Sequence, residues 1–198
     1  MKKILIILLV FINLISYSQN IKNKEWLVLK DNDLKHFTVT KKTKSFTIDE
    51  FRFDVIWDDK LFYSDNIGYY GGIKTLKIFK KNLLINTIEK IEDVIALGEI
   101  GISFFDYNMD GYIDFSLPID SGKVIWSKYY LYDIEQKKYK HIEDWDYIRI
   151  QKLNKKTKQF VTILDGNADE SEQELYQVSG FELVLLKTIK HKSIKITN

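Results

Sequence analysis

The residues from Asp106 to Asp114 read D-Y-N-M-D-G-Y-I-D, and this spacing is typical of a calcium-binding loop. Calcium takes six to eight oxygen ligands, and EF-hand loops supply them from positions 1, 3, 5, 7, 9 and 12, with a glycine at position 6. In this chain positions 1, 3, 5 and 9 carry acidic or amide side chains, and position 7 offers a backbone carbonyl. The predicted ligands are Asp106, Asn108, Asp110, Asp114 and the carbonyl oxygen of Tyr112.

The loop departs from the EF-hand pattern in two ways. Leu117 stands at position 12, where a bidentate glutamate is expected, and residues 100–105 and 112–117 are aromatic and β-branched runs that favour strands. The segment therefore predicts a structural calcium loop between two strands. The alternative is an ordinary turn, since Asn, Asp and Gly are common there too. We favour calcium because three carboxylates this close would repel one another without a cation.

Catalytic signatures are weak in this sequence. The chain has no cysteine, its three histidines lack metal-ligand spacing, and no G-x-S-x-G, P-loop or HExxH motif is present. Acidic residues beside tryptophans, Asp58 with Asp144 or Asp146, could imitate the carboxylate pair of a glycosidase. We predict that the protein is not an enzyme, with a hydrolase using these carboxylates as the alternative.

The N-terminus predicts export. Met1-Lys2-Lys3 is basic, residues 4–15 are apolar apart from Asn13, and small residues at 16 and 18 suit cleavage, so residues 1–18 form a signal peptide. Without cysteine the chain can carry neither a lipid anchor on a lipobox cysteine nor a disulfide. Loss of the two lysines would remove the net charge of +2, and nothing suggests a nucleic-acid surface. We expect a periplasmic protein without a membrane span, the alternatives being a secreted or a cell-surface protein.

The rest of the chain, residues 19–198, predicts a single all-β domain. Short alternating runs joined by charged turns indicate an antiparallel meander of hairpins, propeller-like or sandwich-like. The expected hairpins join residues 37–40 to 45–48, 73–79 to 84–88, 128–134 to 139–142, 148–153 to 159–164, and 174–178 to 181–189. The spacing of Ile88, Ile91, Val94 and Ile95 is also compatible with one short helix between Thr87 and Leu97.

Two further segments are hypotheses for partner binding. The loop around Tyr69 and Tyr70 is rich in glycine and tyrosine, and exposed aromatic residues often anchor protein recognition. Ser121, Gly122 and Lys123 follow the strand that leaves the calcium loop, which could hold them in a fixed position. The alternative for both segments is an ordinary turn.

The order of these features resembles a family of exported bacterial β-proteins with a single calcium loop. The resemblance covers about residues 70–190 and is specific at F-D-Y-N-M-D-G-Y-I-D-F, residues 105–115, while the hairpins match only as a pattern. The best understood members are periplasmic immunity proteins that inhibit lysozyme-like peptidoglycan hydrolases. The loop is also similar to those of FG-GAP (integrin-type) repeats, but it occurs once, so a seven-bladed propeller is not expected.

The resemblance implies a calcium-binding lysozyme inhibitor or immunity protein whose partner is a peptidoglycan hydrolase. Only the metal ligands transfer by position; for inhibition, the resemblance points loosely to Ser121, Gly122 and Lys123. The alternative function is a carbohydrate- or cell-surface-binding module that uses its tyrosines and tryptophans. The sequence leaves the oligomeric state open.

Overall fold

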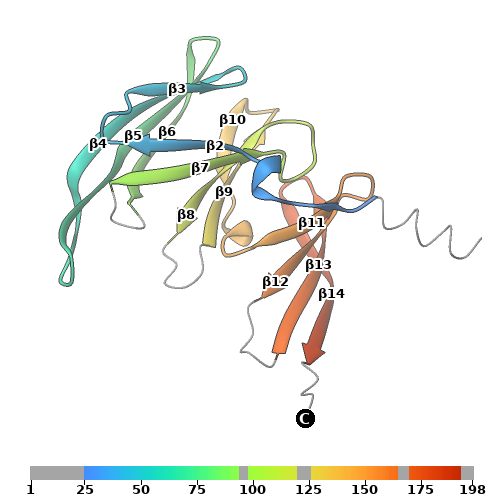
Figure 1. Ribbon diagram of the computed structural model, residues 1–198. Helices are drawn as coiled ribbons and strands as arrows, with labels where there is room; N and C mark the ends of the chain where they lie inside the picture. Colours follow the sequence, from blue (N-terminus) through green and yellow to red (C-terminus); the bar gives the residue numbers. More distant parts are fainter. Residues whose placement is uncertain (1–24, 94–97, 120–125, 165–169, 193–198) are drawn as a thin grey trace, which may run out of the picture. The chain divides into compact units, whose positions relative to one another are not determined.

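The computed structural model describes residues 25–93, 98–119, 126–164 and 170–192. These residues form antiparallel β-strands and two single-turn 3-10 helices, η1 (Asp31–Asp33) and η2 (Glu143–Trp145) (Figure 1). Among them, no helix is long and apolar enough to cross a membrane. The predicted all-β, antiparallel fold is therefore confirmed. The predicted signal peptide, residues 1–18, lies outside the described residues.

The described residues cluster into two compact units. One unit contains Asp31–Arg149 and the short turn Gly180–Glu182, and the other contains residues 25–30, Ile150–Ser179 and the chain from Leu183. Compact units need not fold independently. The prediction of a single domain over residues 19–198 therefore stays a prediction.

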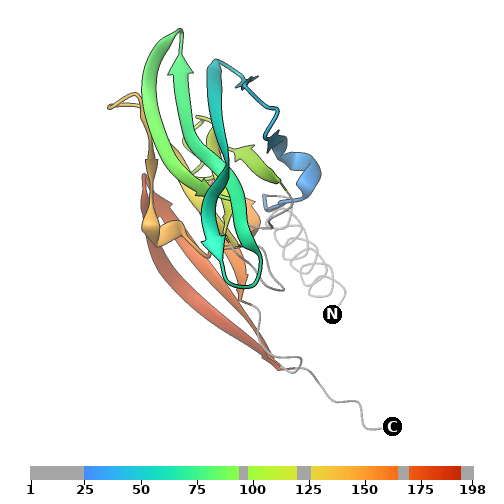
Figure 2. The ribbon, with the colours of Figure 1, turned by 90° about the vertical axis from the view of Figure 1, so that its left-hand side faces the viewer.

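The first unit is a sandwich of two antiparallel sheets. Their strand orders are β10-β9-β8-β7-β2 and β3-β4-β5-β6. The strands of the first sheet are β2 (Lys35–Thr40), β7 (Glu99–Phe105), β8 (Asp114–Ile119), β9 (Trp126–Asp133) and β10 (Lys138–His141); those of the second are β3 (Ser45–Ile48), β4 (Phe51–Ser64), β5 (Gly68–Lys80) and β6 (Leu83–Glu92). The β4–β5 hairpin is long and strongly twisted (Figure 2).

Alternating apolar residues from both sheets form the sandwich core. Phe53 of β4 and Ile102 of β7 are fully buried. The residues two positions before and after each of them lie on the same face and are also buried. Aromatic rings fill the centre: Phe53 stacks on Phe46 at 4.8 Å and meets Phe104 and Phe115 edge-on at 5.4 and 6.0 Å. Such ring pairs add stability beyond the area that they bury.

One predicted hairpin is wrong. Residues 37–40 and 45–48 do not pair with each other: β2 pairs with β7, and β3 pairs with β4 in the other sheet. The turn between them carries the chain from one sheet to the other, and the rings of Phe37 and Phe46 stack across the core at 3.9 Å. Alternation predicts that each strand has an apolar face, but the two strands present those faces to the core from opposite sides.

The helix considered between Thr87 and Leu97 is also wrong where the structure describes it, because residues 87–92 belong to β6. Its helix-like spacing has a physical cause. Ile85, Ile88 and Ile91 all pack against the core although they lie three residues apart. A register shift near Ile85 and a left-handed backbone at Lys90 (φ 55°) each interrupt the two-residue alternation.

The second unit is one antiparallel sheet in the order β1-β11-β12-β13-β14. Its strands are β1 (Leu27–Val28), β11 (Ile150–Asn154), β12 (Gln159–Leu164), β13 (Glu170–Ser179) and β14 (Glu182–Lys192). The other four predicted hairpins are present in the two units, as β5–β6, β9–β10, β11–β12 and β13–β14.

Candidate functional site

The predicted calcium loop joins β7 to β8. Its backbone takes a left-handed conformation at Met109 (φ 60°) and Gly111 (φ 93°), which turns the chain sharply between the two paired strands. Asp114 is the first residue of β8, where it lies opposite Phe105. The predicted position of the loop between two strands is thus present.

The side chains of Asp106 and Asn108 point back over the turn. The carboxylate of Asp106 accepts N–H bonds from Asp110 (2.9 Å) and Gly111 (3.1 Å), one on each oxygen. The amide oxygen of Asn108 accepts a second bond from the N–H of Asp110 at 3.2 Å. These bonds fix the direction of both side chains.

Asp110 completes this part of the loop. Its carboxylate accepts the N–H of Tyr112 at 2.9 Å on one oxygen and the side-chain amide of Asn108 at 2.9 Å on the other. Within the described part of the chain, no group of three or more His, Cys, Asp or Glu side chains has its ligand atoms gathered for a metal ion. The loop carboxylates accept backbone N–H groups, so a bound cation would share their oxygens with these groups and would also take the oxygens of Asn108 and Tyr112.

Asp114 gives the strongest reason to expect a cation here. Its side chain is fully buried and accepts N–H bonds from Tyr107 (2.9 Å), Asn108 (3.4 Å) and Tyr132 of β9 (2.8 Å). Burial, and secondarily the charge of Asp110, raise the pKa of Asp114 well above its usual range, against the effect of the three N–H bonds. Among the described residues, no Lys, Arg or His forms an ion pair with Asp114.

A buried carboxylate without an opposite charge is costly, and a divalent ion would offset that cost. The atoms that could bind a metal here are all oxygens, which are the ligands that calcium prefers. The residues of the loop therefore fit a calcium ion, which would be held by Asp106, Asn108, Asp110, Asp114 and the Tyr112 carbonyl.

The loop also packs against the sandwich as part of its structure. Tyr107 and Met109 are buried. The Tyr107 hydroxyl lies 3.1 Å from the Ser116 hydroxyl, and its ring meets Tyr129 edge-on at 4.9 Å. The backbone carbonyl of Ile113 accepts a bond from the Tyr139 hydroxyl at 3.1 Å. A change at the loop would therefore be felt by β8, β9 and β10.

The predicted partner residues Tyr69 and Tyr70 lie near the tip of the β4–β5 hairpin. Tyr69 is 64% exposed, and its ring lies 5.1 Å from that of Tyr63 on the opposite strand. Tyr70 points to the other face, where it stacks on Phe62 and donates a hydrogen bond to Glu92. Tyr63 and Phe62 were not predicted from the sequence, and the hairpin register places them opposite the predicted tyrosines. Ser121, Gly122 and Lys123 lie outside the described residues.

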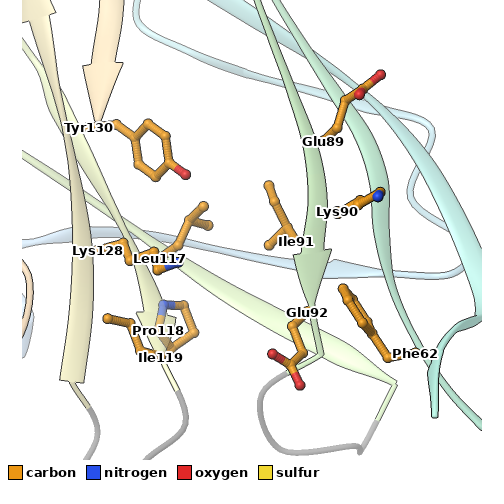
Figure 3. Close-up of a pocket in the computed structure, with 10 residues that line it drawn as sticks. All are labelled: Phe62, Glu89, Lys90, Ile91, Glu92, Leu117, Pro118, Ile119, Lys128 and Tyr130. Atoms are coloured by element: carbon orange, nitrogen blue, oxygen red, sulfur yellow. The ribbon is translucent and has the colours of Figure 1, made fainter. Parts of the chain in front are cut away.

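A cleft of about 220 Å³ opens between β6 and the pair β8 and β9. Figure 3 shows Ile91 and Leu117 facing each other across it, with Tyr130 and Phe62 at its sides. Glu89, Glu92, Lys90 and Lys128 also line the cleft, so charged groups of both signs surround its apolar centre. Burial, with a smaller contribution from the charge of Asp146, raises the pKa of Tyr130 to about 12, which keeps its hydroxyl neutral.

The carboxylates that could imitate a glycosidase pair have other contacts. Asp58 accepts the N–H of Lys60 at 3.0 Å, and both oxygens of Asp146 lie 3.0 Å from the His141 ring. Among the described residues, no hydrogen bond joins Asp58 to Asp144 or Asp146. The Asp58 contact lies within β4, and the Asp146 contact joins the end of η2 to His141 of β10.

Comparison of the chain with models of protein families, with curated proteins and with solved structures finds no match. The resemblance to periplasmic lysozyme inhibitors therefore stays a prediction from the sequence.

Proposed function

We propose that this protein is an exported calcium-binding β-protein that acts by binding another molecule. The observation that carries the proposal is the buried carboxylate of Asp114 at the base of an oxygen-rich loop. Calcium there would stabilise the loop and the strands on which it packs, and it would supply no chemistry. A site of modest affinity suffices outside the cytoplasm, where weaker calcium sites are common.

In its specific form, the proposal is an inhibitor or immunity protein against a lysozyme-like peptidoglycan hydrolase. This form rests on the order of sequence features around the calcium loop. Inhibition would need only a rigid surface that occludes the sugar cleft of the enzyme, consistent with the proposal that the chain is not an enzyme. Export to the periplasm would place the chain where such a hydrolase acts.

Lysis of purified cell walls by a panel of lysozyme-type hydrolases tests this form. We expect stoichiometric protection from one hydrolase in millimolar calcium and weaker protection after chelation. Asp110→Asn should imitate chelation, whereas Glu135→Gln, which also removes one negative charge but from the exposed β9–β10 turn, should protect like the wild type. Failure to protect against the hydrolases of competing bacteria would refute the inhibitor role.

The exposed aromatic residues favour a second candidate, a carbohydrate- or cell-surface-binding module. Tyr63 and Tyr69 present their rings on one face of the β4–β5 hairpin. Aromatic rings offer large contact area together with a polar hydroxyl, which suits a sugar surface. Direct sedimentation with peptidoglycan in the absence of any protein partner would support this role. Tyr69→Ala should then reduce binding, and Tyr147→Ala, at another exposed tyrosine, should not.

A further inference from the structure

Strand β14 lies at the end of its sheet and exposes apolar side chains. It follows β13 in the strand order, and among the described residues no strand pairs with its outer edge. Val184, Leu185 and Leu186 are 49%, 49% and 48% exposed, and Ile189 is 38% exposed. An edge strand of this kind offers a row of unpaired backbone N–H and C=O groups to another strand.

The exposure affects both faces of β14. Successive residues of a strand point to opposite faces, so the three consecutive apolar residues from Val184 to Leu186 cannot be covered by packing on one face. Every residue from 184 to 190 is exposed. A second strand alongside would pair the backbone groups and bring side chains next to these residues on both faces at once.

We propose that β14 pairs antiparallel with β14 of a second copy of this chain, with the two Leu186 residues opposite each other on the two-fold axis. The two five-stranded sheets would then join into one continuous sheet across a closed, symmetric dimer. The proposal is independent of the calcium loop and of the partner that the protein binds.

Symmetry limits the available registers. A two-fold axis normal to the sheet keeps each side chain on its own face, so the axis must pass through a residue opposite its own copy. With Leu186 on the axis, Glu182 of each copy lies opposite Lys190 of the other, which gives two cross-strand pairs of opposite charge. Moving the axis to Lys187 would place two lysines opposite each other, and moving it to Leu185 would remove both charge pairs.

The same register is favourable for the apolar residues. Leu183 lies opposite Ile189, and Val184 lies opposite Thr188, which are pairings that strands favour. Lys187 lies opposite Leu185, where its aliphatic stem can cover the leucine while its charge stays in water. The lysines of β14 would discourage other registers, as charged residues do on the edges of natural sheets.

Charge reversal tests this register. The protein is expressed from the full-length gene and purified in the form in which the cells produce it. Sedimentation velocity at micromolar concentrations should show a dimer for the wild type. Glu182→Lys and Lys190→Glu should each raise the dimer dissociation constant by about tenfold, since each change places like charges opposite each other twice. The double variant Glu182→Lys/Lys190→Glu restores opposite charges and should return the constant to within about threefold of the wild type.

Lys187→Glu is the matched control, because it changes the same charge on the same strand but faces no charged residue in this register. It should dimerise more tightly than Lys190→Glu. Lys190 also forms an ion pair with Glu172 on β13 at 2.6 Å, so urea unfolding of each variant separates a loss of stability from a loss of dimer. A monomer at all concentrations up to submillimolar, or a dimer whose dissociation constant the double variant fails to restore, would overturn the proposal.

Discussion

Replacing Asp110 with asparagine should abolish most of the calcium-dependent stability while leaving the calcium-free protein almost unchanged. Asp110 is exposed, and asparagine keeps an oxygen that can accept the N–H of Tyr112. The variant loses the bond from the side-chain amide of Asn108, worth about 1 kcal/mol. It also removes a charge that acts on buried Asp114, which offsets part of this loss. The calcium-free change should therefore stay within about 1 kcal/mol.

With calcium present the two proteins should differ strongly. At free calcium about 100 times the dissociation constant, binding adds about 2.7 kcal/mol to the free energy of unfolding. Loss of a charged ligand should weaken the affinity by about 100-fold, since even residues outside the ligand shell cost about 10- to 100-fold. The same free calcium concentration then equals the dissociation constant of the variant, and calcium adds only about 0.4 kcal/mol to its free energy of unfolding.

Urea unfolding, followed by tryptophan fluorescence in millimolar calcium and in chelator, measures both quantities. Buried Trp145 should report on the packing of the sandwich. Asp65→Asn is the control for the change in net charge and should keep the full calcium increment. If Asp110→Asn keeps the wild-type increment, Asp110 is not a ligand; if the wild type itself gains nothing from calcium, the loop is an ordinary turn.

Three further predictions concern the sandwich. Phe53→Ala should lower the free energy of unfolding by about 3–5 kcal/mol, since this side chain is fully buried among aromatic rings; urea titration measures the loss. Trp145→Phe should cost about 1–3 kcal/mol by the same measurement, because the indole N–H donates to the Phe181 carbonyl at 2.8 Å and that acceptor would lose its partner. The hydrogen bond from Lys140, and secondarily the N–H of Gln136, lower the pKa of Asp133, so its contribution to stability is present above its ordinary pKa and is lost as pH falls through the lower folded value. Asp133→Asn should remove this loss when the free energy of unfolding is measured at decreasing pH. An unchanged pH profile would show that the pair of Asp133 and Lys140 contributes nothing to stability.

The sequence predicts the strands well because alternation is a local property. Ile100, Ile102 and Phe104 alternate in the sequence and are buried in the predicted strand β7, whereas β4, which carries Phe53, is not among the predicted strands. Which sheet a strand joins is a tertiary choice, and alternation alone does not distinguish β2 pairing with β3 from β2 pairing with β7. Strand β6 shows the same limit. Because its backbone is left-handed at Lys90, isoleucines three residues apart can both face the core, and in the sequence this spacing resembles that of a helix.

The candidate site also has features that the local sequence predicts and features that depend on tertiary contacts. The motif predicts which loop residues carry oxygen ligands and that the loop lies between strands, because both depend on adjacent residues. It gives no sign that Asp114 also accepts the N–H of Tyr132 from β9, which is distant in the sequence. Nor does it reveal that Tyr63 lies beside Tyr69, a contact set by the register of the long hairpin.

The contacts of Asp114 determine how calcium would act on this protein. One of its oxygens holds the N–H of Tyr132 in β9, and the other holds N–H groups of the loop itself. The same carboxylate is a predicted metal ligand, so a bound cation would offset the cost of its buried charge and stabilise both sets of contacts. Tyr107 of the loop is buried, and its ring contact with Tyr129 extends the link further along β9. Chelation should therefore lower the cooperative stability of the whole sandwich, and an effect limited to the loop would mean that the metal is not coupled to the buried carboxylate.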